Sequence, residues 1–66
     1  MKINRKKLEL AMARRCADME YLVAMSGVPR PTLNGAASGR SVRPVIVGRI
    51  AKALKVDPAD IIEKED

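Results

Sequence analysis

Residues 25–40, MSGVPRPTLNGAASGR, hold three of the four glycines and two of the four prolines of the chain. Such a composition is typical of a loop. However, Pro29 and Pro31 fix φ near the helical value, and they lack N–H groups that would have no partner in a first helical turn. We therefore predict a short helix over residues 30–37. Gly35 inside it costs about 1 kcal/mol relative to Ala, so we expect a close approach to a neighbour or a ligand.

The preceding segment carries the signals of a second helix and of its end. Asp18 is a good N-cap and Glu20 is an acidic first-turn residue, so we predict a helix over residues 18–25. Gly27 then supplies the left-handed conformation that helix ends favour. Two helices joined by a turn of three or four residues with a glycine are typical of the DNA-binding helix-turn-helix unit.

Three more helices are predicted around this unit. Asn4 caps a helix over 5–15, Pro44 opens one over 44–55, and Asp57 caps a last one over 58–64. Apolar residues recur at three-to-four spacing, and strand-like alternation is absent. The sequence therefore predicts an all-α fold, a compact five-helix domain over residues 1–66.

The charge is unevenly distributed. Residues 1–55 carry a net charge of +9, whereas residues 56–66 carry −4. A basic body with an acidic end suits a polyanionic partner, although charge alone fits an ordinary soluble surface equally well. Tyr21 is the one aromatic residue, which counts against binding of RNA or single strands by base stacking.

Composition argues against catalysis. The chain has no histidine and a single cysteine, Cys16, so neither a zinc site nor a Cys–His nucleophile is expected. We predict no catalytic residue, no metal, no cofactor and no enzyme, with Cys16 buried or half-buried. The lone cysteine forms no internal disulfide, and no apolar run approaches membrane-spanning length, so we expect a cytoplasmic protein without a membrane partner.

Two stretches resemble the lambda-repressor/Cro family of helix-turn-helix regulators, also called the xenobiotic-response-element family. They are DMEYLVAMSGVPRPTL (18–33) and GRIAKALKVDPADII (48–62), and the resemblance runs from about residue 8 to 62. The residues on the structural positions of the motif are Leu22, Gly27, Val28, Thr32 and Leu33.

Three positions depart from the family pattern. Val23 replaces the usual small Ala of the second helix, Met19 replaces a Gln that contacts phosphate, and Met12 replaces an Arg of the first helix. Phosphate contacts are therefore expected from other cations, namely Arg14, Arg15 and the basic loop over 38–43.

The resemblance implies that the third helix enters the major groove. The base-contacting residues it implies are Arg30, Pro31, Thr32 and Asn34. The phosphate-contacting residues are Arg40, Ser41, Arg43, Arg14 and Arg15. Plain structural interpretations compete with these roles, because Arg30 also fits a solvated surface charge, and Thr32 or Asn34 also fits a local backbone partner.

The resemblance also implies a homodimer on a palindromic operator, with no small-molecule ligand. The candidate dimer surface is on the last two helices, where Val45, Ile46, Ile61 and Ile62 fit either exposed apolar contacts or the core. Ile61 and Ile62 also fit the inward side of the last helix. The predicted function is a sequence-specific double-stranded DNA-binding transcriptional regulator, a repressor of phage or mobile-element type. The alternative is an antitoxin or protein-interaction module with the same fold.

Overall fold

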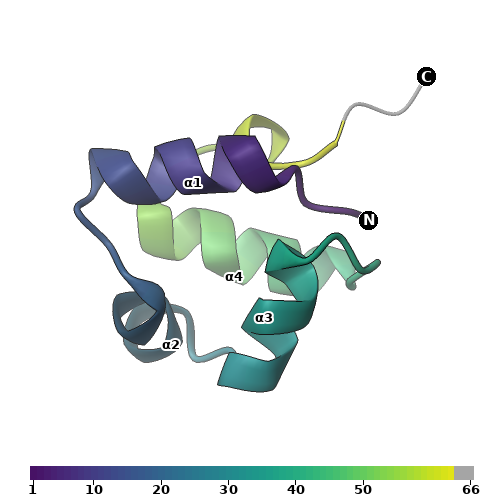
Figure 1. Cartoon of the computed structure of the whole chain (residues 1–66), viewed down its shortest axis with the longest axis horizontal. Coiled ribbons are helices and arrows are strands. Elements are labelled where there is room, and N and C mark those ends of the chain that lie inside the picture. The colour runs from purple at the N-terminus through teal and green to yellow at the C-terminus, as the bar shows by residue number, and fades with distance from the viewer. Residues whose placement is uncertain (64–66) are drawn as a thin grey trace.

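Four α-helices and one 3-10 helix make up the helical structure of residues 1–63, the part of the chain that the computed structural model describes. They are α1 (Arg5–Arg14), α2 (Met19–Ser26), α3 (Arg30–Ala37), α4 (Pro44–Leu54) and η1 (Pro58–Asp60). Figure 1 shows α4 in the middle of the molecule, with α1 along one side of it and the α2–α3 pair on the other. The all-helical prediction is confirmed for these residues.

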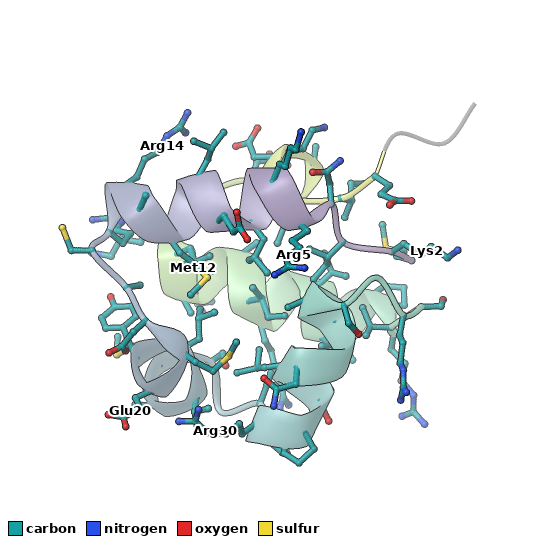
Figure 2. All side chains as sticks on the ribbon, in the orientation of Figure 1. Lys2, Arg5, Met12, Arg14, Glu20 and Arg30 are labelled. Carbon is teal, nitrogen blue, oxygen red and sulfur yellow. The ribbon has the colours of Figure 1, made fainter. Side chains whose placement is uncertain are left out.

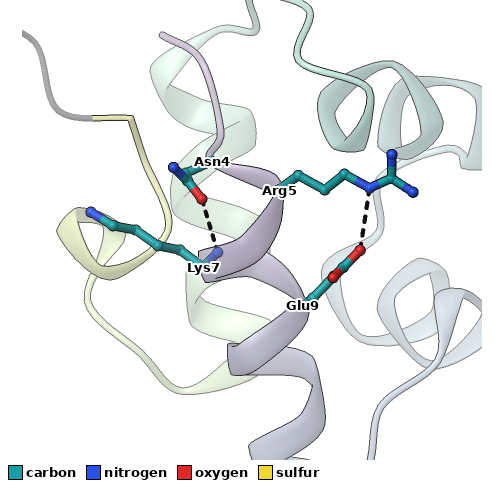
Figure 3. A network of polar contacts seen from close by, with 4 residues as sticks. All are labelled: Asn4, Arg5, Lys7 and Glu9. Atoms are coloured by element: carbon teal, nitrogen blue, oxygen red, sulfur yellow. Dashed lines mark hydrogen bonds and ion pairs between the residues drawn. The ribbon is translucent and has the colours of Figure 1, made fainter.

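Side chains cap the first two helices as predicted. The Asn4 side chain accepts a hydrogen bond from the Lys7 backbone N–H at 3.0 Å (Figure 3), and the Asp18 side chain accepts one from the Tyr21 N–H at 2.8 Å. Each cap satisfies an N–H group that has no partner inside its helix and stabilises the fold by about 1 kcal/mol. The Arg5–Glu9 ion pair in Figure 3 is exposed and therefore adds little.

The prediction of a last α-helix over residues 58–64 is wrong. Only η1, three residues long, forms there, and Asp57 caps it by accepting the Ala59 N–H at 2.9 Å. The chain beyond it pairs instead with the N-terminal segment: the Asn4 N–H donates to the Ile61 carbonyl at 2.8 Å, and the Glu63 N–H to the Lys2 carbonyl at 2.9 Å. These bonds use backbone groups that a continuing helix would need. Position 64 lies outside the described residues.

The core forms around α4. Five of its residues are buried, and α2 and η1 pack against it. No charged or polar side chain is buried among the described residues. The buried apolar residues are Ile3, Leu8, Ala11, Leu22, Val28, Leu33, Ala36, Val47, Ile50, Ala51, Ala53, Leu54 and Ile61.

The structure decides between core and dimer surface for the four apolar residues of the last two predicted helices. Ile61 is fully buried, Ile46 and Ile62 pack partly buried against the core, and only Val45 is exposed, at 56%. An isolated bridge between Ile3 and Ile62 draws the end of the described chain onto the core. Of the two alternatives, the core therefore applies to three of the four residues, and an exposed position applies to Val45.

The prediction for Cys16 is also wrong, because this side chain is exposed. Cys16 lies in the link between α1 and α2 with φ of 51°, so it does not belong to the inward face of either helix.

Candidate nucleic-acid interface

The turn between α2 and α3 fixes how the two helices are joined. Gly27 adopts the predicted left-handed conformation with φ of 70°, and Val28 beside it is fully buried. The Ser26 hydroxyl donates to the Leu22 carbonyl and accepts from the Val28 N–H at 3.1 Å. Because Val28 is anchored in the core and the turn is hydrogen-bonded, the direction of α3 follows from that of α2.

The two sides of α3 differ in character. Leu33 and Ala36 are buried on its inner side. The opposite side, which we call the outer face of α3, consists of Arg30, Pro31, Asn34, Gly35 and Ser38. All of these are exposed except Gly35, which is half-buried. In Figure 2, Arg30 lies at the edge of the molecule farthest from α1.

The structure brings the predicted base-contacting residues to one end of the molecule. Arg30, Pro31 and Asn34 are exposed, and Thr32 is half-buried at the edge of the outer face. Within residues 1–63, the side chains of Arg30, Thr32 and Asn34 form no hydrogen bond or ion pair. The local backbone bonds considered for Thr32 and Asn34 are therefore absent from the described residues, and these groups can bond to a ligand.

The loop after α3 supplies the predicted phosphate-contacting residues Arg40, Ser41 and Arg43, all of them exposed. The start of the chain holds this loop in place. The Val42 N–H donates to the Met1 carbonyl at 2.7 Å, and Lys2 forms an isolated bridge with Ser41. The loop therefore has a defined position beside α3.

Lys2 is a cation of this surface that sequence reasoning missed. Its bridge to Ser41 brings it beside the loop, and Figure 2 shows it extending outward there. No local pattern could have revealed it, because the contact joins residues about forty positions apart. In the sequence, only the basic charge of residues 1–55 suggested that a cation such as Lys2 contacts a polyanion.

The structure does not bring Arg14 and Arg15 to this surface. Arg14 lines a hollow of about 210 Å³ between α1 and η1, and Figure 2 shows it on the side of α1 away from α3. The Arg15 Nε–H donates to the Leu54 carbonyl at 3.2 Å, where it satisfies the C-terminal end of α4.

The three departures from the family pattern contribute to packing. Met12, Met19 and Val23 are all partly buried against the core. Flexible Met side chains fill irregular gaps well, so Met12 and Met19 add apolar contacts to the core, as does Val23.

Neither a metal site nor a membrane span is evident in the described part of the chain. Residues 1–63 contain no group of three or more Cys, Asp or Glu side chains that could hold a metal ion. None of the helices in that range is long and apolar enough to cross a membrane.

Comparisons with known proteins define the fold. The chain is similar to the restriction-modification controller protein C.AhdI from Aeromonas hydrophila, with 26% identity and a TM-score of 0.75, over 85% of this chain and 86% of C.AhdI. It is also similar to part of Phpd, solved with cadmium and hydroethylphosphonate, with 23% identity and a TM-score of 0.83. That match covers 100% of this chain but only 14% of the length of Phpd. No protein-family model and no curated protein sequence matches the chain.

The fold is therefore that of the helix-turn-helix DNA-binding proteins, with α2 and α3 as the two helices of the motif. The predicted lambda-repressor/Cro membership is finer than these comparisons support, and it stays a prediction. The match to Phpd concerns the fold alone.

Proposed function

We propose that this chain is a sequence-specific double-stranded DNA-binding transcriptional regulator that places α3 in the major groove. One observation carries the proposal: α3 is held on its inner side by the core while Arg30 and Asn34 project from its outer face without partners in residues 1–63. The similarity to the controller protein C.AhdI supports a role in regulation. The chain's net charge of +5 favours a polyanionic partner.

The exposed side chains suit distinct parts of a duplex. The Arg30 guanidinium can donate two hydrogen bonds to guanine O6 and N7, and the Asn34 amide can pair with adenine N6 and N7. Pro31 and the Thr32 methyl group offer apolar contact to a thymine methyl. Arg43, Ser41 and Lys2 lie beside α3, where phosphate contacts would fix the register without reading sequence.

The finer parts of the proposal are a homodimer, a palindromic operator and a repressor role of phage or mobile-element type. One helix of eight residues reads about half a site, so a two-fold pair would read half-sites about one DNA turn apart. Val45, on the exposed side of α4, is the apolar residue that stays free for such a contact among those we expected.

Selection of binding sites from a random duplex library at physiological salt tests the proposal. We expect an enriched inverted repeat with arms roughly 10 base pairs apart. Enrichment of a single arm would support DNA reading and contradict the dimer. Recovery of no shared sequence would overturn the proposed function.

Arg30→Ala, measured on the selected site, tests the role of α3. We expect discrimination at one base pair to fall by about 1–3 kcal/mol, because a bidentate contact to a base edge is lost. Arg14→Ala is the matched control, since it also removes one arginine but from the side of α1 away from α3. Equal effects of the two substitutions on base preference would contradict reading by α3.

A further inference from the structure

Gly35 leaves room for the side chain of Arg40 on the outer face of α3. A Cβ atom placed on Gly35 would have the Arg40 Cδ as a neighbour, 3.6 Å away, at ordinary contact distance. Apart from the flanking residues and the backbone of α3 itself, no other part of residues 1–63 lies within 4 Å of this position. The close approach that we expected at Gly35 is thus absent within the described chain, and the aliphatic part of Arg40 lies beside the bare helix instead.

The outer face of α3 has side chains on one edge and little bulk along its middle. Pro31, Gly35 and Ser38 recur at positions i, i+4 and i+7, so they form a stripe of small or rigid residues along the helix. Arg30 and Asn34, four positions apart, form one edge of this stripe. On the other side of the stripe, α3 itself offers only the half-buried Thr32 as a hydrogen-bonding side chain.

Arg40 occupies that second edge. A shallow hollow of about 310 Å³ lies there, and Arg40 lines it. The other lining residues are Pro31, Thr32, Gly35, Ser41 and Val42. The aliphatic stem of Arg40 therefore lies against α3, across the stripe from Arg30 and Asn34.

The backbone at Arg40 is fixed by the end of α3. The Arg40 N–H donates to the Gly35 carbonyl at 3.1 Å, and the Ser38 hydroxyl donates to the same oxygen at 2.9 Å. Gly39, with φ of 95°, allows the chain to reverse there. The Arg40 side chain forms no hydrogen bond or ion pair within residues 1–63. By contrast, Arg43 is the N-cap residue of α4 and does not line the hollow.

From this geometry we infer that Arg40 determines sequence specificity by binding a guanine edge in the major groove, and that Gly35 positions it there. The inference rests on the proposed function and replaces the phosphate role predicted for Arg40. A guanidinium can donate two hydrogen bonds at once, to guanine O6 and N7. The bare stripe over Pro31 and Gly35 lets α3 approach the bases closely enough for an arginine from the following loop to reach them.

Site selection with Arg40→Ala and with Arg43→Ala, compared with the wild-type protein, tests this inference. For Arg40→Ala we expect preference for guanine at one position of the half-site to fall roughly tenfold to hundredfold, with the other positions kept. For Arg43→Ala we expect weaker binding to all sequences alike and a salt slope reduced by about 1, as for a phosphate contact. Both residues are exposed and keep their backbone bonds, so thermal unfolding should confirm intact folds.

Substitution of Gly35 provides a second test in which all charges are kept. Gly35→Leu would occupy the place of the Arg40 stem, so we expect the same guanine preference to weaken. Ala13→Leu is the control, because it adds similar bulk at an exposed position of α1 and should preserve the preference.

The outcomes separate this inference from the proposed function. If Arg40→Ala weakens binding to every sequence by one factor and leaves base preferences unchanged, Arg40 binds phosphate and the inference is overturned, while the regulator proposal stands. If the wild-type protein selects no shared sequence, the proposed function itself fails. Loss of guanine preference at one position in both Arg40→Ala and Gly35→Leu supports the inference.

Discussion

Helices α3 and α4 start in the same way but have different roles in the molecule. Each has a proline in its first turn and no side-chain cap. Yet α4 buries five of its eleven residues, whereas α3 buries two of its eight. The start of a helix is thus a local matter, while its role follows from how much of its surface the core requires. α4 supports the fold, and α3 leaves one face exposed.

Truncating one side chain on each helix tests this difference most strongly. Ile50→Ala in α4 removes a fully buried side chain, so we expect a loss of about 2–5 kcal/mol in the free energy of unfolding. A domain of this size has roughly 3–10 kcal/mol in total, so the variant should unfold at a much lower urea concentration than the wild-type protein. Urea denaturation followed by circular dichroism measures the loss.

Asn34→Ala in α3 is the matched control for Ile50→Ala. Its side chain is exposed, so stability should change by no more than about 0.5 kcal/mol. A large loss for Asn34→Ala would show that the outer face of α3 contributes to the fold after all.

Substitutions of two glycines should change stability by an intermediate amount. Gly35→Ala should stabilise the protein by about 0.5–1 kcal/mol, because Ala favours a helix and its Cβ meets no closer neighbour than the Arg40 Cδ. Gly27→Ala should destabilise by about 1–2 kcal/mol, since φ of 70° is unfavourable for a residue with a Cβ. Thermal melting of both variants gives the two signs. Destabilisation by Gly35→Ala would mean that the fold itself requires this glycine.

The smallest effect is expected on the exposed side of α4. Val45→Asp replaces an exposed apolar residue in the first turn, where a carboxylate suits the helix dipole. We expect stability to change by no more than about 0.5 kcal/mol in urea denaturation at low protein concentration. The same change should weaken the proposed homodimer, which analytical ultracentrifugation would show. A loss comparable to that of Ile50→Ala would place Val45 in the core.

Much of the fold was predictable because its signals are local. Asn4, Asp18 and Gly27 each act on the backbone within a few residues, and all three do what the sequence predicted. The last helix was not predictable in this way. Asp57 does form its cap, but the Asn4 N–H then donates to the Ile61 carbonyl, which a continuing helix would need. A cap residue carries no information about such a distant partner.

The candidate site also has features that the sequence predicted and features that it did not. The position of Arg30, Pro31 and Asn34 on one helix followed from residue spacing. The separation of Arg14 from them, the approach of Lys2 and the direction of Arg40 did not, because each depends on how distant segments pack.

Local sequence signals are enough to specify the four α-helices, their starts and the glycine turn, and composition specifies the net positive charge. These follow from φ preferences, hydrogen bonds within one turn of helix and counts of charged groups, none of which needs a distant partner. Tertiary structure alone decided that Ile61 belongs to the core, that Lys2 joins the loop after α3, and that Arg40 lies along α3. Those outcomes depend on which segments bury one another, and burial is a property of the whole fold.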